Sequence, residues 1–430
     1  MPASPAPERA SELSAEWVLP VDGPPIAGGR VRWEGDRIVE VGPGRAERHY
    51  DDAVILPGFV NAHYHLEYAV YAGFGDGLPF GPWLKTHVER KSRLDAEAMV
   101  AVARCGVADS LRSGITTTAD YSFSGAAAIA AVELGLRAIV YLEVFADDPE
   151  DARRSFEQKR ALVEETALVT IGVSPHAPYT CSLATYQWCL SLGIPVGTHL
   201  AESASENEWL EHGTGALQGI PILVAPTGRR AVATLEPVLG PDLLCAHCVE
   251  ISPDEIALLA ERTVPVAHCP RSNALLGCGV APVAAMRAAG IVVGLGTDSP
   301  ASTPSFDVFE ELRAAVYASR ALERRPEALP ASDALRLATS EAARALRIDD
   351  RVGTLTTGKR ADLTVVSLAG SPYHPVEDPT AAVVFGGSPD RVLETIVDGQ
   401  TRYLKREEEQ WQEVRSIASA ARRRMLAPQP

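Results

Sequence analysis

The sequence has few cysteines and no long hydrophobic run. Seven cysteines among 430 residues are too few, and odd in number, for a secreted domain built around disulfides. No stretch of about 18 consecutive apolar residues occurs, so we expect no transmembrane helix. The first residues lack a basic start followed by an apolar core, so we expect no secretory signal. Together these absences predict a cytoplasmic protein.

Positive charge is also scarce. Forty Lys and Arg residues stand against 56 Asp and Glu residues, which leaves a net charge of −16. Binding to nucleic-acid phosphates or to anionic membrane surfaces needs clustered cations, so we expect neither partner. The hydrophobic share of 46% and the charged share of 22% are typical of an ordinary soluble globular protein. A small molecule is the expected ligand, and a homodimer is the default oligomer.

Eight apolar, β-prone runs alternate with Ala-, Leu- and Glu-rich stretches of helical spacing. Near-continuous apolar strands that are each followed by a helix are typical of a parallel sheet covered on both faces. The count of eight predicts an α/β fold, a (β/α)8 TIM barrel. A doubly wound open sheet is the alternative. The runs are 58–65, 114–121, 136–145, 169–176, 195–200, 242–248, 263–268 and 291–298.

The two ends of the chain have a different residue pattern from the middle. Short β-branched runs with Gly and Asp turns occupy 15–57 and 353–404 and are typical of hairpins. Neither segment is long enough to bury a core alone, so we predict one small composite β-sandwich domain from both. The barrel then takes 58–352, and the charged, helix-prone residues 405–430 form a C-terminal helical tail.

Histidines recur where the predicted strands end. His63 and His65 are two residues apart on an extended run, so both imidazoles point the same way. Carboxyl ends of barrel strands meet at one mouth, where active sites form. Core histidines without function are the alternative, and for His268 a structural role is equally well supported. The further residues at strand ends are His176, His199, His247, His268 and Asp298.

These side chains predict a metal centre. Three imidazoles and one carboxylate suit Zn²⁺ or Fe²⁺ and leave a position open for water. Glu202 lies three residues after His199, where it can act as acid and base, although a first-turn acid of the next helix is the alternative. His247 is a candidate to orient hydroxide. The predicted ligands are His63, His65, His199 and Asp298.

Six segments carry a family resemblance: LPGFVNAHYHLE, SPHAPYT, GTHLAES, AHC, HCPRSN and GLGTDSPAS, in this order. They resemble the amidohydrolase superfamily, in its branch of cytosine-, guanine- and adenosine-type deaminases and chlorohydrolases. The resemblance implies one divalent metal on His63, His65, His199 and Asp298, with Glu202 as proton shuttle and His247 and Asp298 assisting the attacking water. Two-metal members carry a lysine at the end of strand four. Here VTIGVSPH has none, so we predict a mononuclear site with His176 contacting the substrate.

The resemblance also suggests a nucleoside substrate. In the segment PFGPWLKTHVERK, Trp83 would pack on the ligand and Glu89 would hold ribose hydroxyls, although Glu89 also suits a solvated helix face. Ser302 matches the family's contact to the base. Two further stretches, ELGLRAIVYLEVFADDPEDA and HLAESASENEWLEHGTG, look most like aminodeoxyfutalosine deaminases of menaquinone biosynthesis. Their substrate is an adenosine with a carboxylated aromatic group on its 5′ side, and Arg271 is the expected cation for that carboxylate.

Other functions fit the same motifs. A deaminase of methylthioadenosine, S-adenosylhomocysteine or adenosine would use the same pocket. A chlorohydrolase or a cyclic amide hydrolase would use the same metal and proton shuttle. A binding scaffold without catalysis is the alternative of another class, and the intact set of ligands argues against it.

Overall fold

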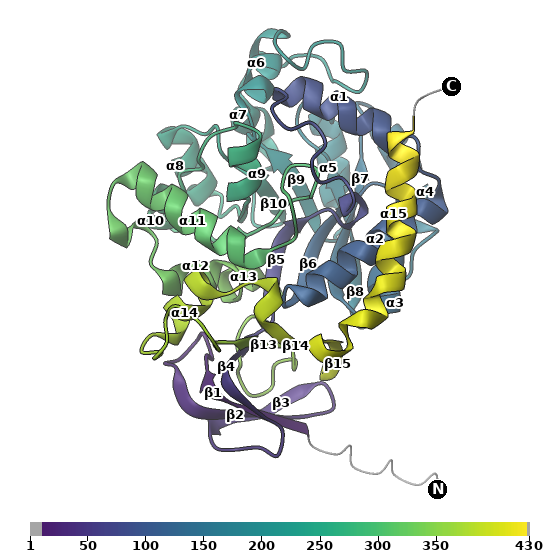
Figure 1. Ribbon diagram of the computed structural model, residues 1–430. Helices are drawn as coiled ribbons and strands as arrows, with labels where there is room; N and C mark the ends of the chain where they lie inside the picture. The colour runs from purple at the N-terminus through teal and green to yellow at the C-terminus, as the bar shows by residue number, and fades with distance from the viewer. Residues whose placement is uncertain (1–10, 428–430) are drawn as a thin grey trace, which may run out of the picture.

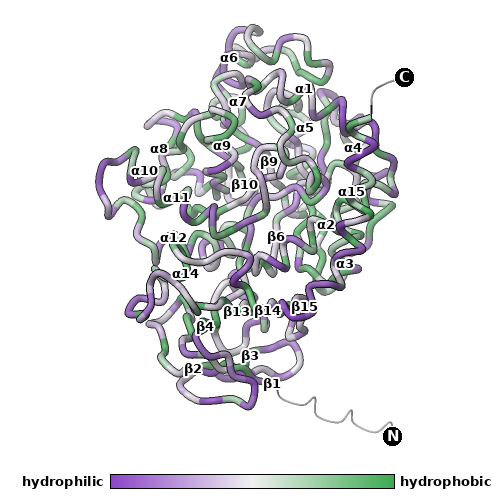
Figure 2. The backbone as a smooth tube through the Cα atoms, viewed as in Figure 1, coloured by the Kyte–Doolittle hydropathy of each residue, from purple (hydrophilic) through white to green (hydrophobic). Residues whose placement is uncertain are grey.

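The computed structural model describes residues 11–427, which form a barrel above a smaller sheet (Figure 1). Hydrophobic segments lie along the central strands, and hydrophilic ones gather on peripheral elements such as α4 (Figure 2). Across the described residues, no helix combines the length and apolar character needed to cross a bilayer.

The larger sheet is the predicted barrel. Its eight strands are parallel and follow one another in chain order, each beside its sequence neighbours. Between the last and the first strand, Tyr64 and Asp298 form a parallel bridge, and the Asp298 amide donates to the His63 carbonyl at 3.1 Å. The prediction of a (β/α)8 barrel is confirmed. The strands are β5 (Phe59–Tyr64), β6 (Ile115–Ser122), β7 (Arg137–Val144), β8 (Val169–Pro175), β9 (Val196–Leu200), β10 (Leu243–His247), β11 (Val266–His268) and β12 (Val293–Leu295).

Helices cover the outside of the barrel, and this explains the uninterrupted apolar runs. Strands β6 and β7 are buried at every position, because one face of each points into the barrel and the other contacts helices. The α-helices up to the end of the barrel are α1 (Phe80–Lys91), α2 (Ala96–Arg112), α3 (Ala126–Leu134), α4 (Pro149–Arg160), α5 (Leu183–Ser191), α6 (Ala204–His212), α7 (Ala231–Leu235), α8 (Pro253–Glu261), α9 (Pro270–Leu275), α10 (Val283–Ala288), α11 (Val308–Glu323), α12 (Ala331–Leu337) and α13 (Ser340–Ala345). Short 3-10 turns are η1 (Leu66–Tyr68), η2 (Glu236–Val238) and η3 (Pro326–Ala328).

Strands from both ends of the chain pair in the second sheet. Its order is β15-β14-β13-β4-β1-β2-β3, antiparallel except for the parallel pair β1 and β4. Leu13, Val31, Ile55 and Leu363 belong to its own buried cluster. The residue bounds of three separate domains stay a prediction. The strands are β1 (Ser11–Val18), β2 (Ile26–Glu34), β3 (Arg37–Pro43), β4 (His49–Pro57), β13 (Leu363–Ser367), β14 (Val392–Val397) and β15 (Gln400–Leu404), with α14 (Pro379–Gly386) and η4 (Pro389–Arg391) between β13 and β14.

The end of the described chain returns to the barrel. After η5 (Lys405–Trp411), helix α15 (Gln412–Leu426) runs alongside α2 (Figure 1). The Arg422 guanidinium donates to the carbonyl of Ala72 at 2.9 Å, and Arg93 donates to the carbonyl of Met425 at 2.8 Å. These bonds tie α15 to the segments that precede and follow α1.

A buried ion pair joins the two sheets. Arg137 begins β7 of the barrel, and its guanidinium donates to both carboxylate oxygens of Asp362 at 2.9 and 3.1 Å. It also donates to Asp398 at 2.8 Å. Arg137 and Asp362 are each 4% exposed, so water cannot replace a lost partner.

We expect Arg137→Met to lower the free energy of unfolding by about 3–5 kcal/mol, because it leaves buried carboxylates without their cation. The measurement is urea unfolding followed by circular dichroism. Arg153→Met is the control, since Arg153 contacts Glu150 on the exposed surface of α4, and it should leave the unfolding midpoint unchanged. Equal midpoints for the wild type and Arg137→Met would contradict the structural role of this pair.

Candidate metal centre and substrate cavity

The predicted metal ligands meet at the carboxyl end of the barrel. The Nε2 atoms of His65 and His199 are 3.4 Å apart. An oxygen of Asp298 lies 3.5 Å from His65 Nε2 and 3.7 Å from His63 Nε2. These spacings let the four side chains share one ion, whose ligand bonds would be about 2.0–2.2 Å.

The backbone at this end of the barrel adopts unusual conformations. Ala201, His247 and Asp298 have φ of 50°, 75° and 55°, the left-handed region that non-glycine residues seldom adopt. Such residues cluster at functional sites, because the surrounding structure must hold them there. Gly296 is needed for close approach, since a Cβ at this position would lie 2.7 Å from the Cβ of His63.

Hydrogen bonds set the direction of two of the imidazoles. His65 Nδ1 lies 2.8 Å from the Tyr121 carbonyl, and His199 Nδ1 lies 2.9 Å from the His176 carbonyl. A carbonyl only accepts, so each Nδ1 carries the proton and each Nε2 lone pair points to the centre.

The environment of His63 is a test of whether a metal fits. Its imidazole is fully buried, and among residues 11–427 neither ring nitrogen has a hydrogen-bond partner. A buried polar atom without a partner is costly, and a cation among these donors would remove that cost. Burial also lowers the pKa of His63 well below its usual value, which keeps the imidazole neutral and able to act as a ligand. The donor set therefore fits a divalent metal.

Asp298 is kept ionised despite its burial. Burial favours the neutral carboxyl, but the imidazoles of His65 and His247 and a hydrogen bond from Ser272 outweigh it, so the pKa of Asp298 is lowered. The Ser272 and Ser302 hydroxyls donate to one carboxylate oxygen at 2.6 and 2.9 Å. The other oxygen faces the histidines.

Glu202 has the opposite shift. Burial, followed by the negative charges of Asp298 and Glu206, raises the pKa of Glu202 well above its usual value. Its loop is held because the Glu206 carboxylate accepts from the Ala201 and Glu202 amides at 3.0 and 2.8 Å. A carboxyl that carries a proton near neutral pH suits an acid that protonates a substrate.

His247 stands beside Glu202. Its Nε2 lies 3.8 Å from a Glu202 oxygen, and its Nδ1 lies 3.0 Å from the side-chain amide nitrogen of Asn273. Burial lowers the pKa of His247 to about 3, so the ring is neutral. A neutral imidazole that accepts at Nδ1 presents an Nε2–H donor to the centre.

A cavity of about 490 Å³ opens above these groups. Its wall includes the predicted metal ligands His65, His199 and Asp298, with Glu202 and His247. Trp83 and His176, both predicted to contact the substrate, also line it. The remaining wall is largely apolar, and its aromatic rings include Tyr68, Phe80, Phe123, Phe145 and Tyr179.

Three predicted substrate contacts lie outside this cavity. Glu89 faces the surface and pairs with Arg93 at 2.7 Å. This agrees with the alternative prediction, in which Glu89 lies on a solvated face of its helix. Arg271 is buried, and its guanidinium is held by Glu311 and by Glu310 at 2.8 Å, so its charge is not free for a carboxylate. Ser302 donates to Asp298, which makes it a support for the centre in this conformation. The ring of His268 is buried and does not line the cavity.

Several residues that line the cavity or support the centre were not predicted from the sequence. Phe123 and Phe145 directly follow β6 and β7, and their positions at strand ends could have revealed them. Ser272 and Asn273 lie in the HCPRSN segment, next to Arg271. His87 and Lys91 line the cavity from α1, and no motif marked them.

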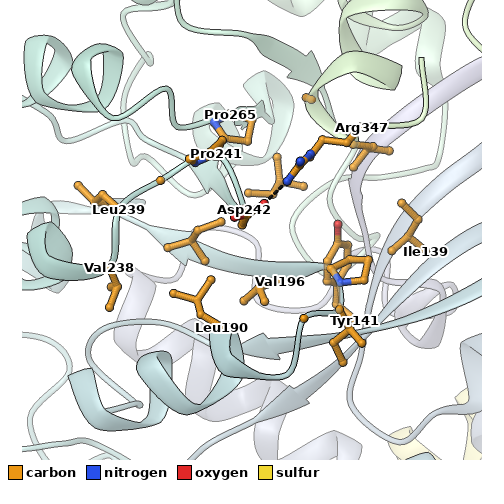
Figure 3. A pocket seen from close by; sticks show the side chains of 18 of the residues that line it. Ile139, Tyr141, Leu190, Val196, Val238, Leu239, Pro241, Asp242, Pro265 and Arg347 are labelled. Atoms are coloured by element: carbon orange, nitrogen blue, oxygen red, sulfur yellow. Dashed lines mark hydrogen bonds and ion pairs between the residues drawn. The ribbon is translucent and has the colours of Figure 1, made fainter. Parts of the chain in front are cut away.

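A larger cavity of about 720 Å³ lies at the opposite end of the barrel. Figure 3 shows it, with Val196, Pro241 and Pro265 from the starts of strands and the ion pair of Asp242 with Arg347. In the part of the chain that the structure describes, every group of three His, Cys, Asp or Glu side chains able to share a metal lies at the other end. The smaller cavity is therefore the candidate active site, as in other TIM barrels.

Curated relatives are similar over most of the chain. The 5-methylthioadenosine/S-adenosylhomocysteine deaminase of Moorella thermoacetica is 35% identical over 403 residues, covering 89% of this chain and 91% of the relative. The 5′-deoxyadenosine deaminase of Methanothermobacter thermautotrophicus is 32% identical over 400 residues, covering 88% and 90%.

Solved structures share the fold. An adenosine deaminase from Xanthomonas campestris with bound zinc has a TM-score of 0.87 at 27% identity, covering 96% of this chain and 98% of that one. Atrazine chlorohydrolase from Arthrobacter aurescens, complexed with zinc, has a TM-score of 0.84 at 22% identity, covering 96% and 99%. The model of the amidohydrolase family matches residues 54–402, which include every predicted metal ligand. With this match and relatives similar over most of its length, the chain belongs to the amidohydrolase family.

Proposed function

We propose that this protein is a metal-dependent aminohydrolase that replaces the 6-amino group of an adenosine-type nucleoside with oxygen and releases ammonia. The observation that carries the proposal is the buried cluster of His63, His65 and His199 with Asp298 3.5 Å from His65, beside Glu202, whose pKa is raised, at the base of a largely apolar cavity. Deaminases of 6-aminopurine nucleosides among its relatives support this substrate class.

The donor set would hold one Zn²⁺ or Fe²⁺, because no lysine follows β8 to bridge a second ion. When bound, the metal would lower the pKa of a coordinated water towards neutrality. Glu202 would give its proton to a ring nitrogen of the purine, which makes the neighbouring carbon more electrophilic. The Nε2–H of His247 would hold the incoming oxygen by donating to it. Water adds to C6, the C6–N bond breaks, and protons moved by Glu202 allow the amine to leave as ammonia.

The preferred substrate in this proposal is 6-amino-6-deoxyfutalosine, an intermediate of menaquinone biosynthesis. The two sequence stretches that resemble aminodeoxyfutalosine deaminases support this choice. The aromatic rings around the cavity would also pack on an additional aromatic group beyond the purine. Methylthioadenosine, S-adenosylhomocysteine and adenosine are the competing substrates within the same proposal.

Ammonia release from a panel of nucleosides tests the proposal. We expect turnover of at least one 6-aminopurine nucleoside, with the carboxylated aromatic nucleoside having the highest kcat/KM. The panel also holds a chlorotriazine, followed by chloride release, and a cyclic amide, followed by chromatography of the ring-opened product. Turnover of one of these with no 6-aminopurine nucleoside deaminated would overturn the deaminase assignment.

Removal of one imidazole tests the metal centre. We expect His63→Ala to lose most of the bound divalent metal and the activity, because it removes a ligand that has no other partner. Metal per chain is measured by plasma mass spectrometry after purification and dialysis. His212→Ala, at an exposed histidine on α6, should retain wild-type metal. A His63→Ala protein with full metal content would remove His63 from the ligand set.

Glu202→Gln tests the proton shuttle separately from the metal. We expect kcat/KM to fall about 10²- to 10⁴-fold with metal content unchanged, because the amide cannot carry the proton. Glu208→Gln, at an exposed glutamate on α6, is the matched control and should keep wild-type activity. Activity of Glu202→Gln within a few-fold of the wild type would show that another group moves the proton.

A further inference from the structure

Helix α1 presents one face to the cavity. Trp83, His87 and Lys91 are spaced four residues apart, so they lie above one another on the helix, and all three line the cavity. The Trp83 and His87 rings are 4.6 Å apart. Lys91 lies in the last turn, at the end of this row. A cation in the wall of this cavity needs a physical explanation, because burying an ammonium without a directly paired counter-charge is unfavourable.

The Lys91 ammonium is bonded but not neutralised. Its Nζ donates to the Tyr68 hydroxyl at 2.9 Å and lies 3.5 Å from the centre of the Phe123 ring. The Phe145 ring centre is 6.0 Å away. Among residues 11–427, no carboxylate oxygen lies within the 4.0 Å of an ion pair with Lys91. Burial lowers the pKa of Lys91 to about 8, which still leaves it mostly charged at neutral pH.

The nearby carboxylates of Glu143 and Glu67 act on Lys91 through their charge but form no ion pair with it, and Glu143 also lines the cavity. The Glu67 carboxylate accepts from Ser124 and also from Ser122. The Glu143 carboxylate lies with the ring nitrogens of His176 and His199, all within 4.8 Å of one another. Lys159 donates to the Glu143 carbonyl at 2.5 Å and does not line the cavity. Lys91 is therefore the cation that a bound molecule can reach.

Lys91 is also close to the reaction centre. The Tyr68 ring, whose hydroxyl accepts from Lys91, is 5.5 Å from the His65 ring, centre to centre. The Phe145 ring is 4.6 Å from the His176 ring. One aromatic side chain thus separates Lys91 from each of these histidines.

We propose that Lys91 binds a carboxylate carried by an aromatic ring on the 5′ side of the nucleoside, and that it sets the preference for this substrate. The inference rests on the proposed function. The Phe123 and Phe145 rings, 6.1 Å apart and both partly exposed, provide the surface on which such a ring packs. An amino-acid substituent is less suited, because its ammonium group would meet the charge of Lys91. A neutral substituent would leave that charge without a partner.

The test crosses a protein substitution with a substrate substitution. The two substrates are an adenosine with a carboxyphenyl group on its 5′ side and the methyl ester of the same compound. We expect Lys91→Met to lower kcat/KM for the acid about 10- to 100-fold, the effect of losing a charged hydrogen bond. For the ester the change should stay below about threefold, because the interaction is absent in both proteins. Lys85→Met, at an exposed lysine of the same helix, should leave both values unchanged.

The outcomes separate this inference from the proposed function. If the wild type deaminates the ester and 5′-methylthioadenosine, but Lys91→Met affects acid and ester equally, the role of Lys91 is overturned and the deaminase assignment stands. If no nucleoside is deaminated, the proposed function fails. A wild type that prefers adenosine 5′-monophosphate over the acid would assign the cation to a phosphate and overturn the aromatic carboxylate. Metal content and thermal midpoint equal to the wild type show that Lys91→Met is folded.

Discussion

Closure of the barrel between β5 and β12 is the constraint on which the site depends. His63 and His65 come from the first strand and Asp298 from the end of the last one, more than two hundred residues later in the chain. The bond from the Asp298 amide to the His63 carbonyl, with the bridge between Tyr64 and Asp298, brings them to one centre. Gly296 makes this approach sterically feasible, since a Cβ there would overlap His63. The left-handed backbone at Asp298 then turns its carboxylate towards the imidazoles.

Burial favours the neutral form of both Asp298 and Glu202, but their neighbours give the two carboxylates opposite net pKa shifts. Asp298 has two serine donors and the neighbouring histidines, so its pKa is lowered and it remains a ligand. Glu202 lies against Asp298 without such donors, so burial and the like charge raise its pKa and it keeps a proton. In many active sites, two carboxyl groups have pKa values that lie far apart, so that one serves as the acid and the other stays ionised. Here the neighbours of each carboxylate, and not its own chemistry, decide the role.

The barrel and the cluster of histidines and Asp298 at its mouth were predictable because strand ends carry both signals in the sequence. Apolar runs marked the strands, and a histidine or aspartate at the end of a run marked the mouth. Substrate contacts on α1 were not predictable in this way. Whether Glu89 or His87 faces the cavity depends on how α1 rotates against the barrel, and helical periodicity leaves that rotation undetermined when both faces carry charge. The structure places His87 in the wall and Glu89 at the surface.

Arg271 and Lys91 show why a cation cannot be assigned to a ligand from sequence position alone. Both are largely buried and both lie near the mouth, but Arg271 meets the buried Glu311 and the partly exposed Glu310, so its charge is balanced within the protein. Lys91 has a tyrosine hydroxyl and two aromatic rings, which stabilise a cation weakly and leave its charge unbalanced. Of the chain's five lysines, Lys91 is the one that lines the cavity. A ligand with a negative charge can gain the interaction that no carboxylate of the protein makes with Lys91. Lys91, and not the paired Arg271, is therefore positioned to select the substrate.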